Sequence, residues 1–105
     1  ITAVSGSGPA YVFAFIEALE KAAIAQGLST DQARLLATQT VLGAATLASQ
    51  STESPGTLRE RVTSKGGTTY AALQVLEKLN WSGIIGEAVA AASARGAEMG
   101  EEFGK

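Results

Sequence analysis

The sequence predicts an all-α domain of five helices. Apolar residues recur at helical spacing over several long stretches. Glycine, proline and serine stand where such stretches begin and end, and we assign no stretch to a β-strand. The chain has 105 residues, which suits one small domain that buries roughly 65% of its unfolded surface. We therefore expect a single helical domain over residues 1–105.

The first expected helix runs from Pro9 to Gly27. Proline is common at the first helical position, and here a loop of serine and glycine precedes it. The opening AYVFAFI is rich in β-branched and aromatic residues, so a buried strand is the competing interpretation. The pattern continues without a break to Gly27, a typical C-cap, and this length favours a helix.

The second expected helix covers residues 29–51, with Ser29 or Thr30 as N-cap and an acidic residue in the first turn. Its main apolar face consists of Ala33, Leu36, Ala37, Thr40, Val41, Ala44 and Leu47. Leu35 and Leu42 lie on another side. A helix that is apolar nearly all round is normally buried, and a chain this short cannot bury two such helices alone. We therefore expect a homodimer.

Three more helices are expected in the second half of the chain. Ser54 is a typical N-cap, and Pro55 is a typical first residue of a short helix. A fourth helix over residues 67–80 begins at a pair of glycines. Residues 80–83 are expected to break the fourth helix, and a last helix is expected over residues 84–105.

Composition excludes several classes of function. The net charge is −2 and no block of like charge occurs, so the basic patch of a nucleic-acid-binding protein is missing. The chain contains no Cys and no His, which removes thiol nucleophiles, imidazole bases and most zinc sites. The absence of cysteine fits a cytoplasmic protein. No apolar run approaches the roughly 18 residues that a membrane-spanning helix needs, so no membrane is expected.

One glycine-rich motif lies at the start, where residues 5–9 read Ser-Gly-Ser-Gly-Pro. They match half of the dinucleotide-binding fingerprint. The third glycine is absent, however, and no strand precedes the motif as a βαβ unit would require. The favoured interpretation is a flexible turn that leads into the first helix.

The second glycine-rich motif covers residues 65–69, Lys-Gly-Gly-Thr-Thr, at the expected start of the fourth helix. The residue order does not match a Walker A loop. Glycine lets a ligand approach the backbone closely, and the first N–H groups of a helix lack internal partners and favour an anion. Ser64, Thr68 and Thr69 add hydroxyl groups. The motif fits a carboxylate or a phosphate, although chemistry alone favours a simpler role in which Thr68 caps the helix.

Charged side chains near this loop make weaker candidates. Arg59 and Arg61 flank Glu60 and are close enough in sequence to reach a bound acid, but a solvated helix face is the favoured interpretation. Glu98 and the acidic residues after it have no histidine or cysteine near them. We interpret them as surface residues and expect no metal site.

Three stretches, SGSGPAYVFAFIEALEKAAIAQGLS, QTVLGAATLA and SPGTLRERVTSKGGTTYAAL, resemble the C-terminal domain of pyrroline-5-carboxylate reductase. Two motifs carry the resemblance: Ser-Gly-Ser-Gly-Pro-Ala-Tyr at residues 5–11 and Val-Thr-Ser-X-Gly-Gly-Thr-Thr at residues 62–69. Each is weak alone, and the two together are specific. The resemblance covers essentially the whole chain.

The resemblance implies a partner domain and a reaction. A Rossmann domain that holds NADPH or NADH would precede this chain, which we expect to be a fragment without a cofactor site of its own. The helical domain would form an intertwined homodimer, which in some members assembles further into decamers. The reaction would reduce 1-pyrroline-5-carboxylate to L-proline, the last step of proline biosynthesis. We expect the chain alone to be inactive.

The resemblance also assigns a substrate site to the second glycine motif. Ser64, Gly66, Gly67 and Thr68 are expected to bind the substrate, chiefly through its carboxylate. Thr69 is expected to bind it as well, and to act as the catalytic residue with its hydroxyl toward the ring nitrogen. A threonine hydroxyl is a poor acid, so water is an alternative source of the proton.

Two positions depart from the family pattern. Many members have proline where this chain has Lys65, so the loop is expected to be less stiff here, and the lysine adds positive charge. Gly96 interrupts a last helix that relatives continue with better helix formers. Two alternatives stay open: a purely structural helical oligomerisation module, and the helical domain of another dehydrogenase of the same superfamily, whose catalytic lysine motif is not found.

Overall fold

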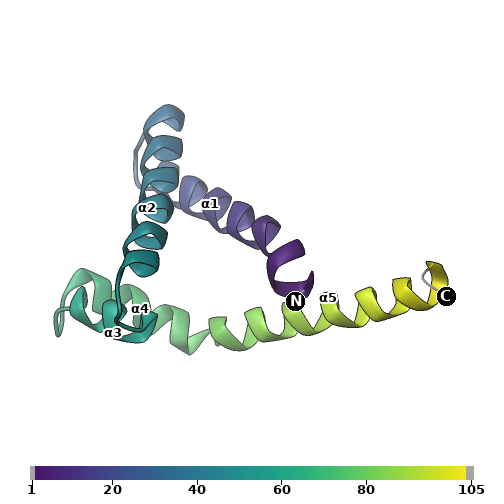
Figure 1. Ribbon diagram of the computed structural model, residues 1–105. Coiled ribbons are helices and arrows are strands. Elements are labelled where there is room, and N and C mark those ends of the chain that lie inside the picture. The colour runs from purple at the N-terminus through teal and green to yellow at the C-terminus, as the bar shows by residue number, and fades with distance from the viewer. Residues whose placement is uncertain (1, 104–105) are drawn as a thin grey trace. The chain divides into compact units, whose positions relative to one another are not determined.

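The computed structural model describes residues 2–103 and contains five α-helices and one turn of π-helix. No strand occurs among these residues, so the prediction of an all-α fold with five helices is confirmed (Figure 1). Residues 104 and 105 of the expected last helix lie outside the described range. The elements are η1 (Thr2–Gly6), α1 (Gly8–Ala25), α2 (Thr30–Gln50), α3 (Pro55–Arg61), α4 (Thr68–Lys78) and α5 (Trp81–Phe103).

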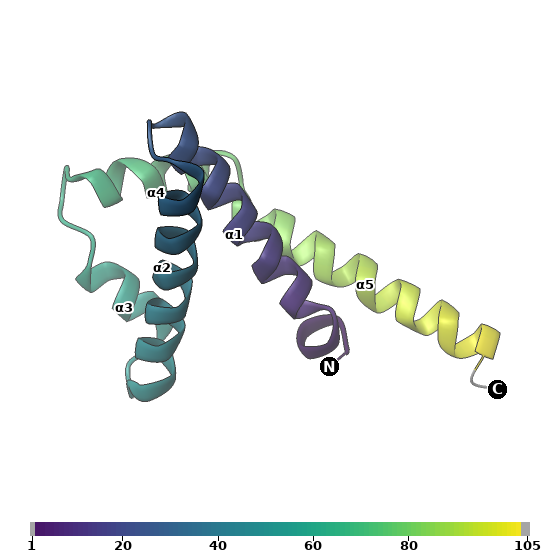
Figure 2. The ribbon, with the colours of Figure 1, turned by 90° about the horizontal axis from the view of Figure 1, so that it is seen from above.

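The chain divides into two compact units. The central unit, Ala10–Val62, contains nearly all of α1 together with α2 and α3. The terminal unit combines Ile1–Pro9 with Thr63–Lys105 and contains η1, α4 and α5. Within the terminal unit, η1 lies against α5, and α4 contacts α5 where the two helices follow one another (Figure 2). The second glycine motif thus belongs to the terminal unit.

Glycine ends α1 as the sequence predicts. Gly27 has φ of 106°, a conformation that side chains rarely adopt. Its N–H donates to the Ile24 carbonyl at 2.9 Å, and the N–H of Leu28 donates to the Ala23 carbonyl at 3.1 Å. This pair of bonds is the Schellman motif, which satisfies carbonyl groups that the helix end would otherwise leave unpaired.

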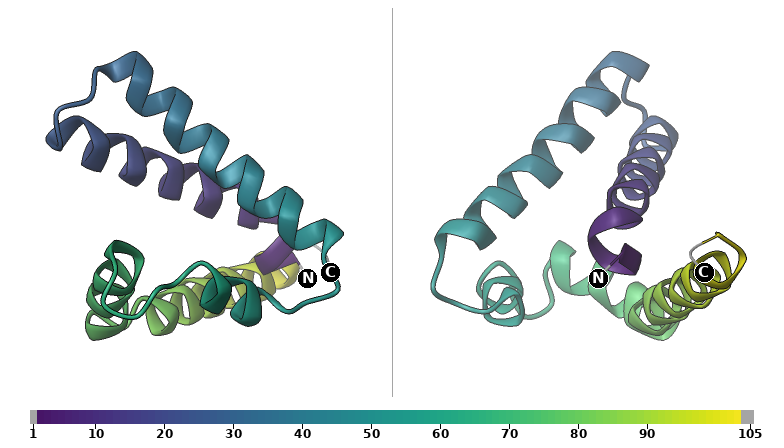
Figure 3. Two further views of the ribbon diagram at one scale, coloured as in Figure 1. Left: turned by 90° about the vertical axis from the view of Figure 1, so that its left-hand side faces the viewer. Right: turned by 45° about the vertical axis from the view of Figure 1, so that its right-hand side comes forward.

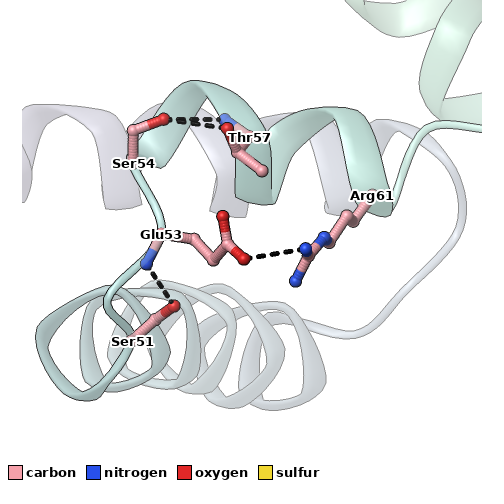
Figure 4. Close-up of polar contacts among 5 residues, drawn as sticks. All are labelled: Ser51, Glu53, Ser54, Thr57 and Arg61. Carbon is pink, nitrogen blue, oxygen red and sulfur yellow. Dashed lines mark hydrogen bonds and ion pairs between the residues drawn. The ribbon is translucent and has the colours of Figure 1, made fainter.

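Serine side chains begin the next two helices, so both predicted N-caps are confirmed. The Ser29 hydroxyl accepts from the Gln32 backbone and the Gln32 side chain accepts from the Ser29 backbone, each at 3.2 Å, which forms a capping box. The Ser54 hydroxyl accepts from the Thr57 backbone at 3.1 Å, and Pro55 occupies the first helical position (Figure 4).

In the central unit α1 and α2 are antiparallel and diverge from their connection (Figure 3). The buried residues described there are Ala33 and Ala37, which are small. Leu35 and Leu42 lie about half a turn away from these alanines on α2 and are 60% and 56% exposed. Burying one leucine contributes roughly 1.5–3 kcal/mol, and a domain needs about 5–15 kcal/mol of net stability. Two buried alanines cannot supply this, so the apolar sides of the unit need a partner surface.

The main apolar face that the sequence predicts on α2 is only partly buried. Leu36 and Leu47 share that face with the buried alanines, yet they are 52% and 54% exposed. The divergence of α1 from α2 is the physical reason, because no helix of the same unit follows that face along its length. An ion pair between Arg34 and Glu20, 3.2 Å apart, joins the two helices.

The first glycine motif does not form a flexible turn throughout. Thr2–Gly6 forms a π-helical turn in which the Ser7 N–H donates to the Thr2 carbonyl at 2.8 Å. Ala3 is 7% exposed, and the turn lies against α5. Long-range packing therefore stabilises a conformation that the local sequence does not predict. Pro9 is the second residue of α1, within one position of its expected place.

The junction between α4 and α5 is shorter than expected. Asn80 has φ of 57°, a left-handed conformation that asparagine tolerates better than most residues, and its carbonyl accepts from Ile84 at 3.0 Å. As a result α5 begins at Trp81 and includes Gly83 in its first turn. The Asn80 side chain occupies the space that a Cβ atom of Gly83 would need. The sequence predicts that the break ends at residue 83, and this is wrong by three residues because α5 already begins at Trp81.

Replacing Gly96 with alanine is expected to stabilise α5. The residue lies inside the helix, and a Cβ atom there would meet no other atom of the chain within 4 Å. Alanine is favoured over glycine by about 1 kcal/mol in a helix interior, so the thermal midpoint should rise. The matched control is Gly27→Ala, which places alanine at a φ of 106° and should lower the midpoint. Equal shifts for the two variants would contradict this account.

Candidate functional site

Residues Ser64 to Gly67 form a tight turn at the entrance of α4. The Gly67 N–H donates to the Ser64 carbonyl at 3.0 Å, and Gly66, the third residue, has φ of 74°. These two features are those of a type II turn, in which the third position favours glycine because its φ is positive. A Cβ atom on Gly67 would lie 3.3 Å from both the Cβ and the carbonyl oxygen of Ser64. The two glycines therefore have distinct roles, one conformational and one steric.

No side chain caps the N-terminus of α4. The N-cap residue is Gly67, which lacks a side chain that could accept a hydrogen bond. The prediction that Thr68 caps the helix is wrong, because Thr68 is already the first helical residue. The first intrahelical bond runs from Ala71 N–H to the Gly67 carbonyl at 3.1 Å. The N–H groups of Thr68, Thr69 and Tyr70 precede it and have no intrahelical acceptor.

The electrostatic setting of α4 differs from that of α2. The first turn of α2 contains Asp31, whose carboxylate complements the positive end of the helix dipole. The first turn of α4 contains no acidic residue, and Lys65 is the one charged side chain between residues 62 and 76. The entrance of α4 is therefore positive, and no acid of the same segment neutralises it.

The structure brings the predicted site residues together in one short segment. Ser64, Gly66 and Thr68 are exposed, whereas Gly67 and Thr69 are partly buried. Two sets of hydrogen-bond donors are thus available to a small anion: hydroxyl groups of the loop and backbone N–H groups of the helix. The sequence interpretation named the hydroxyls and the first N–H groups of the helix as a class, but it did not name Tyr70 among them.

The nearby arginines take part in other contacts. Arg61 donates to a Glu53 carboxylate oxygen at 2.8 Å, and the Glu53 N–H donates to the Ser51 hydroxyl at 3.0 Å (Figure 4). The Arg61 and Glu53 side chains are 63% and 38% exposed, and an exposed pair of this kind contributes about 0–1 kcal/mol. Arg61 therefore helps to hold α3 against the preceding connection. This contact was not expected from the sequence.

Comparison with a family model decides the family. The model, described as pyrroline-5-carboxylate reductase dimerisation, matches residues 1–99. The chain belongs to this family. The resemblance inferred from the two glycine motifs is confirmed. Among the described residues no helix has both the length and the hydropathy to cross a bilayer, and no group of acidic side chains there is arranged to hold a metal ion.

Known members of the pyrroline-5-carboxylate reductase family are close in sequence and structure. The reductase of Pisum sativum is 50% identical over 99 residues, which are 94% of this chain and 36% of that protein. The reductase of Synechocystis is 48% identical over 102 residues, 97% of this chain and 38% of the relative.

Solved structures of pyrroline-5-carboxylate reductases have the same fold. The structure from Coxiella burnetii matches with a TM-score of 0.91 and 49% identity, over 93% of this chain and 36% of that one. The structure from Plasmodium falciparum, solved with NADP bound, matches with a TM-score of 0.91 and 37% identity, over 94% of this chain and 38% of that one. The chain thus spans little more than a third of the length of these family members.

Proposed function

We propose that this chain is the dimerisation and substrate-carboxylate-binding domain of a pyrroline-5-carboxylate reductase. The observation that carries the proposal is the family match over residues 1–99, because it includes both glycine motifs. NADPH or NADH would be held by the remainder of the protein, since the first glycine motif is divided between the π-helical turn and the start of α1, and no strand precedes it among the described residues. When bound, the nicotinamide supplies a hydride to the C=N carbon of the substrate ring.

The entrance of α4 would bind the substrate carboxylate. An anion placed there accepts hydrogen bonds from the unpaired N–H groups of Thr68, Thr69 and Tyr70 and from the hydroxyls of Ser64 and Thr68. Hydrogen bonds to a charged group contribute about 1.5–3 kcal/mol each. The glycines at positions 66 and 67 allow the close approach that these bonds require. This set of donors fixes one end of the ring.

Thr69 would orient the other end of the substrate. It is partly buried, and its own N–H is among the donors that would hold the carboxylate. We propose that its hydroxyl contacts the ring nitrogen and that water supplies the proton, because an unperturbed hydroxyl is a poor acid. The contribution of this chain to catalysis is then orientation of the ring against the cofactor.

We also propose a homodimer in which a second copy covers the apolar sides of the central unit. Leu35 and Leu42 face away from the buried alanines of α2, so only another chain or another part of the protein can cover them. Two copies of this same surface would bury each other in an isologous contact. In light scattering, a decamer would have five times the mass of the dimer. The cytoplasmic location stays a prediction.

The function is tested by comparing the complete protein with the isolated chain. The complete protein should oxidise NADPH or NADH in the presence of 1-pyrroline-5-carboxylate and release proline, whereas the isolated chain should not. Titration of isotope-labelled chain with L-proline should shift the amide signals of residues 66–70 selectively. A complete protein without this reductase activity would overturn the proposal. If the chain dimerises, but the complete protein is inactive and L-proline shifts no amide signals of the isolated chain, a purely structural module is favoured.

A further inference from the structure

The positive end of α4 and the charge of Lys65 act on the same small region. Lys65 is the second residue of the turn whose fourth residue, Gly67, is the N-cap of α4. Two peptide steps separate the lysine from the N-cap, so their Cα atoms are at most about 7.6 Å apart. The Lys65 side chain is exposed and carries its ammonium group on a flexible four-carbon stem.

This placement opposes the stability of the free helix. A cation near a helix N-terminus is unfavourable, because the macrodipole already places positive partial charge there. Compensation by an acidic neighbour is not found, since Lys65 has no ion pair with any described acidic residue. A local arrangement that lowers stability without a compensating contact is characteristic of a functional position. An anion bound at the helix entrance would be attracted both by the Lys65 ammonium group and by the positive end of the α4 dipole, and it would offset the repulsion between them.

We propose that Lys65 is an affinity-determining residue that attracts the carboxylate of the substrate electrostatically. The proposal rests on the proposed function of the α4 entrance as the carboxylate site. Lys65 does not need a fixed hydrogen bond for this role, because its charge raises the local potential whichever rotamer it adopts. Exposed charges act over a distance set by salt, with a screening length of about 30 Å at 0.01 M and about 3 Å at 1 M ionic strength. The effect of Lys65 must therefore disappear at high salt.

The test uses steady-state kinetics of the complete reductase with Lys65→Gln at about 0.01 M and about 1 M ionic strength. At low salt the variant should raise KM for the imine substrate about two- to fivefold, as expected for an exposed charge interaction, and leave kcat unchanged. At high salt its KM should equal that of the unmodified enzyme. Lys65→Arg should behave like the unmodified enzyme under both conditions.

Lys78→Gln is the matched control, because Lys78 is exposed at the opposite end of α4 and its loss changes net charge equally. This variant should leave KM unchanged. Inhibition constants give a second readout: Lys65→Gln should weaken L-proline but not L-prolinamide, which lacks the carboxylate. An unchanged KM at low salt, an increase that persists at high salt, or an equal effect of Lys78→Gln would overturn the proposal. Absence of imine reduction by the unmodified protein would instead overturn the proposed function.

Discussion

Replacing Leu42 with aspartate is expected to dissociate the dimer and to unfold the chain with it. Leu42 is 56% exposed and lies with Leu35 on the side of α2 away from Ala33 and Ala37. Without this leucine, each of the two subunits loses about 2 kcal/mol of the free energy gained by burial in the dimer. The two losses together weaken association by about a thousandfold, and the cost of desolvating the new carboxylates adds to this. Between residues 2 and 100, where burial is described, the buried hydrophobic residues are three alanines, and so small a core is not expected to keep its fold as a monomer.

Aspartate at position 74 is the control for Leu42→Asp. Gln74 is an exposed polar residue in the middle of α4, outside the central unit, so Gln74→Asp places the same side chain in a helix without removing apolar surface from the proposed interface. Light scattering at micromolar concentration should give a dimer for Gln74→Asp and no dimer for Leu42→Asp. Circular dichroism should show that helicity is lost with the dimer. A dimeric, fully helical Leu42→Asp protein would contradict the proposed interface.

Replacing Gly66 with valine is expected to remove most of the affinity for the substrate. The φ of 74° at Gly66 lies in the left-handed region, where a β-branched residue is strained by about 1–3 kcal/mol. The turn would relax into another conformation and move Ser64 relative to the first N–H groups of α4. Loss of one charge-assisted hydrogen bond, about 1.5–3 kcal/mol, corresponds to a KM that is about 10- to 150-fold higher.

Gly66→Asn separates conformation from the mere presence of a side chain. Asparagine adopts the left-handed region more readily than other residues with a Cβ atom, and a Cβ atom at this position would meet nothing within 4 Å. The asparagine variant of the complete reductase should therefore keep KM within a few fold of the unmodified enzyme. The idea fails if asparagine raises KM as much as valine does, because the effect would then be steric.

Local chemistry explains why several elements could be predicted from the sequence. Ser29, Ser54 and Gly27 act on backbone groups within a few residues of themselves, so their roles follow from short sequence patterns. Asn80 shows the limit of this reasoning. Its left-handed conformation lets α5 begin at Trp81, whereas the glycine that follows at position 83 had suggested a longer break.

Features that depend on distant contacts were not accessible from local patterns. The π-helical turn of Thr2–Gly6 lies against α5, and nothing in its five residues predicts that packing. The sequence predicts an anion site at the glycine motif before α4, and its simpler alternative places Thr68 in the N-cap position that Gly67 occupies. A shift of one residue decides whether the helix caps itself or leaves its first N–H groups available to a ligand.

Because α1 and α2 diverge, a single subunit buries little apolar surface of its own. This has a kinetic consequence for mixtures of related chains. If a subunit must lose its fold in order to leave its partner, exchange between two dimers proceeds at the rate of unfolding rather than at the rate of diffusion. Dimers assembled at different times, or from two versions of the same chain, would then keep their original pairing. Subunits labelled with two fluorophores should mix only over the lifetime of the native state, and warming should accelerate the mixing steeply.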